Sequence, residues 1–348
     1  MTTPASILHD PAPRGIRLAL ALDAGLALPA PELCVYRPRA GEDFSPLLSA
    51  LPREAVQMVQ GFKPDHEALA QAGWAVAAST ARAAAALICL PRAKAEAFAL
   101  IAEAIAQGAR LIVVDGQKSD GVESVLKAVR ARVPVSEAIS KAHGKLFWFA
   151  PAGVDFSDWA AAPRNLHDPA LGTFETLPGV FSADGIDPGS ALLAASLPPK
   201  LPARMADLGA GWGYLSAAVL ARDGIETLHL VEAEAQALDL ARRNIKDPRA
   251  QFHWADACSF ALPDSLGGVV MNPPFHTGRS AQPALGLAFI ATAARMLGTR
   301  GRLWMVANRH LPYEGALAQS FQRHEILAET SAFRVWQASG PRSTNLRR

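Results

Sequence analysis

Two segments of the chain repeat the same order of predicted elements, and this repeat constrains the fold more than any other feature. One segment begins at Ala86 and the other at Val269. Each contains an apolar strand, a proline-containing turn, an alanine-rich helix, a glycine, an arginine and a second apolar strand. Strands that alternate with helices in this way are typical of parallel sheets with crossover helices. The repeat therefore predicts two tandem α/β domains related by duplication.

Other β-rich runs extend this pattern along the chain. In the first half we predict a helix at residues 94–107 and strands at residues 33–36, 86–90, 110–114 and 146–149. In the second half we predict strands at residues 204–208, 227–231, 251–254, 268–271 and 302–307. Two closing runs, at residues 325–329 and 333–338, are separated by only a few residues and predict an antiparallel hairpin.

The length and composition fit two globular domains. The chain has 348 residues, of which 50% are hydrophobic and 19% are charged, so it can bury a large core. The stretch from Pro151 is rich in Ala, Pro and Asp and shows no sustained periodicity. We therefore predict a first domain at residues 1–150, a linker at residues 151–176 and a second domain at residues 177–348.

The charge and the cysteines exclude several classes of protein. The net charge is +2, from 34 Lys and Arg against 32 Asp and Glu, which excludes a polybasic arm but not a local basic patch. Cys34, Cys89 and Cys258 are far apart and form no CxxC pair, so neither a disulfide framework nor a zinc knuckle is expected. We expect buried thiols, a reducing cytoplasm and no metal.

The sequence also gives no sign of a membrane segment. The N-terminal stretch MTTPASILHDPAPRG has polar residues and prolines where a signal peptide needs an apolar run. Apolar stretches such as residues 83–90 are far shorter than the roughly 20 residues that span a bilayer. We expect a cytoplasmic protein.

A glycine-rich turn follows the predicted strand at residues 204–208. Its sequence runs from Asp207 to Gly213 as DLGAGWG and opens a helix predicted at residues 214–221. Glycines permit a sharp turn and let a ligand approach the backbone closely. The next strand ends at Glu232, whose carboxylate can accept hydrogen bonds from both ribose hydroxyls of a nucleoside cofactor. Together the two features predict a nucleoside-cofactor site.

Two cofactor classes fit this pattern. A dinucleotide site uses GxGxxG, with a helix N-terminus facing the pyrophosphate. Here the spacing is GxGxG, Tyr214 stands where the third dinucleotide glycine would lie, and Asp207 would repel a phosphate. An acidic residue suits the sulfonium and ammonium groups of S-adenosylmethionine, which we therefore predict. Asp256 follows the third strand and is expected to accept a hydrogen bond from the adenine amino group, with a loop or helix-cap role as the alternative.

The motif NPPF, Asn272 to Phe275, directly follows the fourth strand of the second half. The two prolines stiffen the backbone and supply no N–H donors. The Asn272 side-chain oxygen and the Pro273 carbonyl can each accept one N–H of an exocyclic amine, which favours a pyramidal nitrogen aimed at a methyl group. Phe275 can stack on the base, a contact worth roughly 1–3 kcal/mol. Such a site needs positioning and electrostatics and no strong base; a rigid turn without chemistry is the alternative.

These features resemble the class I S-adenosylmethionine-dependent methyltransferases. More narrowly, they resemble the bacterial ribosomal RNA guanine-N2 methyltransferases of the small-subunit methyltransferase C group and its large-subunit relatives. The resemblance is carried by LPGVFSADGIDPGSALLAASL, DLGAGWGYLSA, VEAEAQALDLARRN, NPPFHTG and FRVWQAS, which cover most of residues 177–338. It implies two tandem Rossmann-like methyltransferase domains. The first is a degenerate copy, and the second is a seven-stranded class I sheet with an antiparallel closing hairpin.

The resemblance also implies roles for individual residues. The implied cofactor-binding residues are Asp207, Gly209, Gly211, Gly213, Glu232, Asp256 and Asn272. Among them, Asp207, Gly209 and Gly211 would lie along the methionine part. Glu232 would hold the ribose, and Asp256 the adenine. The implied catalytic residues, which would hold the target guanine amine, are Asn272, Pro273, Pro274 and Phe275.

The implied partner is small-subunit ribosomal RNA or the assembled 30S subunit, with residues 1–150 as the docking surface and scaffold. One alternative keeps the chemistry on a large-subunit guanine, a DNA adenine N6 or a protein glutamine; the last two classes typically carry Tyr in place of Phe275. Another is a catalytically idle RNA-binding assembly factor.

Several further residues have open roles. His276 either contacts the base or phosphate or is satisfied by its own turn. Trp212 is expected to pack near the cofactor. Ser182, Asp184 and Asp187 belong to the family's entrance segment and either cover the cofactor or form turns. A basic rim around NPPF would consist of Arg279, Arg309, Arg334, Arg342, Arg347 and Arg348.

Overall fold

The computed structural model describes residues 12–29, 32–79, 82–274 and 283–342. The chain divides between Ala162 and Pro163 into two compact units, each with its own sheet and its own buried clusters. Within the described ranges, every helix is too short or too polar to cross a membrane.

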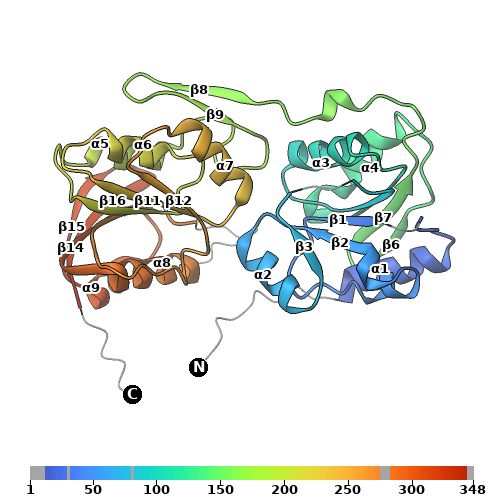
Figure 1. Ribbon diagram of the computed structural model, residues 1–348, viewed down its shortest axis with the longest axis horizontal. Helices are drawn as coiled ribbons and strands as arrows, with labels where there is room; N and C mark the ends of the chain where they lie inside the picture. The colour runs from blue at the N-terminus through green and yellow to red at the C-terminus, as the bar shows by residue number, and fades with distance from the viewer. Residues whose placement is uncertain (1–11, 30–31, 80–81, 275–282, 343–348) are drawn as a thin grey trace, which may run out of the picture. The chain divides into compact units, whose positions relative to one another are not determined.

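The first unit is a seven-stranded sheet covered by helices on both faces (Figure 1). The strands follow the order β3-β2-β1-β4-β5-β7-β6, and only β7 runs antiparallel to its neighbours. Its strands are β1 (Leu33–Tyr36), β2 (Val56–Val59), β3 (Ala75–Ala77), β4 (Ala85–Cys89), β5 (Leu111–Gln117), β6 (Ile139–Lys141) and β7 (Gly144–Phe149). Its helices are α1 (Ala12–Asp23), α2 (Lys63–Gln71), α3 (Lys94–Ala106) and α4 (Val122–Arg130), with short 3-10 turns η1 (Ser45–Ser49), η2 (Arg53–Ala55), η3 (Lys118–Asp120) and η4 (Ser157–Trp159). Helices α3 and α4 cover one face, and α1 and α2 the other.

The second unit repeats this architecture. Its sheet has the order β12-β11-β10-β13-β14-β16-β15, in which the strands occupy the same sequence of places as in the first unit. The strands are β10 (Arg204–Leu208), β11 (Thr227–Glu232), β12 (Ala250–Trp254), β13 (Leu266–Met271), β14 (Leu297–Asn308), β15 (Phe321–Glu329) and β16 (Phe333–Pro341). The helices are α5 (Pro188–Ser196), α6 (Tyr214–Leu220), α7 (Ala235–Asn244), α8 (Pro283–Met296) and α9 (Glu314–Ser320). Helices α5, α6 and α7 lie on one face of the sheet, and α8 and α9 lie on the other (Figure 1).

The predicted fold class is confirmed. Both units are α/β sheets of seven strands, and β15 pairs antiparallel with β16 as the closing hairpin. The parallel strands β10, β11 and β13 bring their carboxyl ends to one edge, because β10 lies between the other two. This edge is where an open α/β sheet binds its ligand.

Part of the segment predicted as a linker forms a hairpin, β8 (Arg164–Asp168) with β9 (Gly172–Thr176). Its one strongly buried aromatic residue, Phe174, packs against Trp212 and Tyr214 of the glycine turn. The Tyr214 hydroxyl donates to Asp168 Oδ2 at 2.9 Å. The hairpin therefore packs against the glycine turn and the start of α6. Its short, polar strands give little signal in the sequence.

The first unit has a turn with the same backbone geometry as the glycine turn, but an arginine stands at its first position. Gly209 follows β10, has φ of 77°, and donates its N–H to Val231 O at 2.9 Å. Arg37 follows β1, has φ of 56°, and donates its N–H to Val59 O at the same distance. The Arg37 guanidinium donates to Glu96 at 2.8 Å, so a paired arginine stands where the second unit has Gly209. This supports the interpretation of the first unit as a degenerate copy.

Candidate functional site

The glycine turn connects β10 to α6. Gly209, Gly211 and Gly213 have φ of 77°, 56° and 97°, a backbone region in which a side chain causes strain. Gly211 matters most for a ligand, since a Cβ atom built there meets no heavy atom within 4 Å. The turn therefore leaves a bare backbone surface that a cofactor can approach closely.

Glu232, at the end of β11, holds this turn in place. One carboxylate oxygen accepts the Gly211 N–H at 2.8 Å, and the other accepts the Glu234 N–H at 2.7 Å. Burial raises the pKa of Glu232, while these backbone donors oppose the rise. Each oxygen keeps a second lone pair, so the carboxylate can still accept a ribose hydroxyl. Glu232 thus has a structural role in the turn that the sequence does not reveal.

Asp207 is a fully buried carboxyl at the end of β10. Its Oδ2 accepts the Ser216 hydroxyl at 2.7 Å, and its Oδ1 has no hydrogen-bond partner. Burial raises the pKa of Asp207 to about 7, and the nearby charge of Glu232 adds to the rise. A buried acceptor without a partner is costly, so Asp207 favours a ligand that supplies a positive charge or a donor.

Asn272 lies just beyond the end of β13, and its amide orientation is fixed. Its Nδ2 donates to Asp187 Oδ2 and to Ser190 Oγ, both at 2.9 Å. The opposite orientation would place the amide oxygen against the Asp187 carboxylate. Since both N–H groups are used, Oδ1 is the group left to bind a ligand, and it can only accept.

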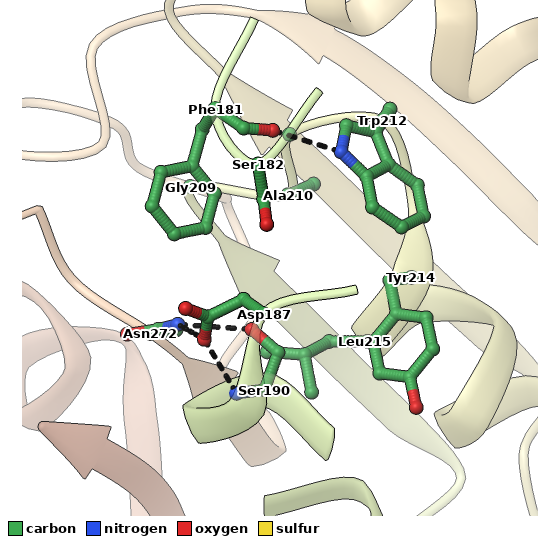
Figure 2. A pocket seen from close by; sticks show the side chains of 11 residues that line it. Phe181, Ser182, Asp187, Ser190, Gly209, Ala210, Trp212, Tyr214, Leu215 and Asn272 are labelled. Carbon is green, nitrogen blue, oxygen red and sulfur yellow. Dashed lines mark hydrogen bonds between the residues drawn. The ribbon is translucent and has the colours of Figure 1, made fainter. Parts of the chain in front are cut away.

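The glycine turn and Asn272 line one pocket, whereas Asp207 and Glu232 are not among its lining residues (Figure 2). The glycine turn contributes Gly209, Ala210 and Gly211, and β13 leads into Asn272. The loop before α5 and the first turn of α5 also line the pocket. They belong to the predicted entrance segment and contribute Phe181, Ser182, Asp187 and Ser190. Trp212, Tyr214 and Leu215 complete the pocket.

Neither Ser190 nor Phe181 is among the site residues predicted from the sequence, although both line the pocket, and Asp187 is given only a covering or turn-forming role. The signal was present, since Asp187-Pro188-Gly189-Ser190 is a helix-start pattern, and Asp187 does cap α5 by accepting the Ser190 N–H at 2.7 Å. The contact with Asn272 joins segments distant in the chain, which no local pattern reveals. Trp212 lines the pocket, is buried, and donates its Nε1–H to Phe181 O at 2.9 Å.

The remaining predicted site residues are placed as follows. Pro273 is buried and Pro274 is exposed, while Phe275 and His276 lie outside the described residues. Asp256 forms a turn in which its Oδ1 accepts the Cys258 N–H at 2.9 Å. It does not line the pocket around Asn272, so its predicted contact with adenine stays a prediction.

The described members of the predicted basic rim are engaged within the protein. Arg309 and Arg334 both form ion pairs with Glu329, at 2.6 and 3.2 Å. Arg342 donates its Nε–H to Phe321 O at 3.0 Å. Arg279, Arg347 and Arg348 lie outside the described residues. An arginine paired with a carboxylate attracts phosphate less strongly, so Arg309 and Arg334 are weaker candidates for phosphate contact than the prediction assumes.

Comparison with known proteins finds similarity mainly in the second unit. Residues 172–337 match the Methyltransferase small domain family. Ribosomal RNA small subunit methyltransferase C of Cronobacter sakazakii is 34% identical over 167 residues, which cover 48% of this chain and 49% of that protein. The protein of the same name from Klebsiella pneumoniae is 35% identical over 169 residues, covering 47% and 48%. The aligned part of the chain spans about half the length of these curated relatives.

A solved structure extends the likeness of fold to both units. The T. thermophilus 16S rRNA N2 methyltransferase RsmC, in complex with AdoMet and guanosine, covers 94% of each chain with a TM-score of 0.73 and 23% identity. The two-unit fold described above is therefore the fold of that protein. The glycine turn, Glu232 and Asn272 all lie within residues 172–337, the part of the chain that matches the Methyltransferase small domain family.

Proposed function

We propose that this chain transfers a methyl group from S-adenosylmethionine to the exocyclic N2 amine of a guanine in 16S ribosomal RNA. The observation that carries the proposal is the fixed amide of Asn272, whose Oδ1 accepts no hydrogen bond from any described residue and belongs to the same pocket as the bare backbone of Gly211. The Asn272 oxygen can accept a hydrogen bond from the target amine, while the glycine turn lets the methyl donor approach the backbone in the same pocket. The names of the curated relatives support ribosomal RNA as the substrate.

Residues of the pocket and of the strands that lead to it fit the cofactor by charge and by shape. The unpartnered Oδ1 of Asp207 is a buried acceptor that the cationic methionine part would satisfy directly or through water. The open space above Gly211 admits that part against the backbone. Glu232 would accept a ribose hydroxyl, and Asp256 would accept from the adenine amino group. S-adenosylmethionine supplies an electrophilic methyl group on a sulfonium sulfur.

The chain's own residues would position the amine. Asn272 Oδ1 and the Pro273 carbonyl would each accept one N–H, which directs the nitrogen lone pair toward the methyl carbon. The N–C bond forms as the S–C bond breaks, and the nitrogen, now acidic, releases a proton to solvent. Positioning and preorganised acceptors supply the catalysis. The base would leave its helix to enter the pocket, as other enzymes that modify bases require.

The first unit would serve as a docking surface for free 16S rRNA or the 30S subunit in the cytoplasm. In the first unit the paired Arg37 stands at the position of Gly209, which argues against a second cofactor site there. Expressing residues 163–348 alone tests the division of labour, because the second unit has its own cores. We expect cofactor binding to remain and RNA binding to be lost; RNA binding equal to that of the full chain would contradict the docking role.

The direct test is incubation of the full chain with methyl-labelled S-adenosylmethionine and 30S subunits that lack N2-methylguanosine. The RNA is then digested to nucleosides. Label in N2-methylguanosine supports the proposal, provided that Asn272→Ala abolishes it. Label in large-subunit RNA, DNA adenine or protein glutamine would retain the chemistry and reject the substrate. Absence of label together with intact RNA binding would indicate an assembly factor.

A further inference from the structure

We propose that Phe181 is the surface on which the target guanine stacks, an inference that rests on the function proposed above. Phe181 lines the pocket that contains Asn272, and its side chain is 57% exposed. An exposed phenyl ring costs free energy in water. Beside a catalytic amide, such a ring offers a flat apolar surface to a flat ligand.

The loop that carries Phe181 is held in a defined conformation. Trp212, itself buried, donates its Nε1–H to Phe181 O at 2.9 Å. The Thr176 hydroxyl donates to Ala183 O at 2.8 Å, and the Ser182 hydroxyl donates to Gly185 O at 2.5 Å. The exposure of the ring is therefore built into an anchored loop. A preset surface loses little entropy when it binds a ligand.

The position of the ring assigns it to the target base instead of the cofactor's adenine. In the view of Figure 2, Phe181 and Asn272 lie at one end of the pocket, and Trp212 and Tyr214 lie at the other. Glu232 and Asp256, the residues proposed for ribose and adenine, do not line this pocket. A phenyl ring binds the face of a base while Asn272 binds its edge. The two together would fix both the plane and the amine of the guanine.

Binding of a fluorescent guanine analogue tests this assignment. 2-Aminopurine riboside keeps the exocyclic amine, and its fluorescence is quenched when it stacks on an aromatic ring. The full chain, saturated with S-adenosylhomocysteine, is titrated with this nucleoside. Three variants are compared: Phe181→Leu, which keeps the apolar volume, Phe181→Tyr, which keeps the ring, and Phe62→Ala, a control at an exposed phenylalanine of the first unit.

We expect Phe181→Leu to raise the Kd of the nucleoside by about 5- to 150-fold and to reduce the quenching. Phe181→Tyr should restore both, and Phe62→Ala should match the wild type. The Kd of S-adenosylhomocysteine should change less than about twofold throughout, a difference below roughly 0.5 kcal/mol. Melting temperatures of the variants exclude a general loss of structure.

Three results would overturn the assignment. One is a larger loss of affinity for S-adenosylhomocysteine than for the nucleoside in Phe181→Leu, since the ring would then serve the cofactor. Another is unchanged nucleoside binding in that variant, and the third is a wild type that does not bind the nucleoside. A wild type that binds and quenches the nucleoside but methylates no RNA would reject the proposed function and leave the stacking surface standing.

Discussion

Asp187 Oδ2 accepts a hydrogen bond from Asn272 Nδ2 at 2.9 Å while it also accepts the backbone N–H of Ser190 at 2.7 Å. One carboxylate oxygen therefore starts helix α5 and orients the amide that follows β13. A helix cap alone is worth about 1 kcal/mol. This double use makes Asp187 a positioning residue for the proposed reaction, and its loss should be felt in turnover as well as in stability.

The first prediction concerns this positioning role. Asp187→Ala should lower kcat by about 100-fold, since small misplacements of a reacting group have effects of this size, with little change in cofactor affinity. Asp187→Asn should recover much of the activity, because its amide oxygen can still accept both N–H groups. Single-turnover kinetics and cofactor titration separate the two effects. Equal loss in the two variants would show that the amide orientation of Asn272 does not depend on this acceptor.

The second prediction concerns Asn272 itself. Asn272→Ala removes the proposed acceptor for the amine and should reduce kcat by about 100- to 1,000-fold, as loss of one preorganised polar group does. The double variant with Asp187→Ala should be little slower than Asn272→Ala, because both changes act through one group. Additive losses in the cycle would contradict that coupling.

The third prediction separates cofactor binding from chemistry. Glu232→Ala removes the acceptor for the Gly211 N–H and the proposed ribose contact. We expect the Kd of S-adenosylhomocysteine to rise by roughly 10- to 100-fold, the equivalent of two lost hydrogen bonds, while kcat at saturating cofactor falls far less. Glu232→Gln should lie between, since its amide retains one oxygen acceptor. Calorimetric titration measures the Kd, and a kcat effect larger than the Kd effect would be contrary to this role.

The fourth prediction is a pH dependence of stability. Burial raises the pKa of Asp207 to about 7, whereas an unfolded Asp has a pKa near 3.9. Below about pH 4 both states are protonated and the group has no effect on stability. Between about pH 4 and 7 the folded state keeps a proton that the unfolded state releases, so stability falls as pH rises, and above pH 7 the cost is complete.

Asp207→Asn removes that cost. At pH 8 the variant without cofactor should therefore unfold at a higher urea concentration than the wild type, and this gain should shrink toward pH 4. The same variant should bind cofactor more weakly, because it lacks the buried negative charge. Urea unfolding at several pH values measures the effect. A gain that does not depend on pH would exclude Asp207 as its source.

The proximity of the glycine turn and Asn272 was predictable because both lie at strand ends. Asp207 is the last residue but one of β10, the glycines follow that strand, and Asn272 follows β13, the strand beside it. A parallel sheet brings such ends together whatever the side chains between them do. Most strands of the second unit and the closing hairpin were predictable from their sequence, because their apolar runs are continuous or bounded by clear turns.

The parts that escaped prediction depend on tertiary contacts or on very short segments. Strand β2 (VQMV) is interrupted by Gln57 and β3 has only three residues, so neither gives a continuous apolar run such as that of β1. Hairpin β8–β9 is mostly polar and is held by Phe174 and by the bond from Tyr214 to Asp168. The second role of Asp187 is a tertiary contact as well. Its capping role is local and readable, but its bond to Asn272 exists only because the fold brings the start of α5 beside the residue that follows β13.

The most direct test of the central claim is a structure of the full chain with S-adenosylhomocysteine and guanosine. The account predicts that the guanine N2 lies within hydrogen-bond distance of Asn272 Oδ1, with the cofactor's sulfur facing the same nitrogen across the pocket. A guanine whose N2 points away from Asn272, or a cofactor whose sulfur lies away from the glycine turn, would contradict it.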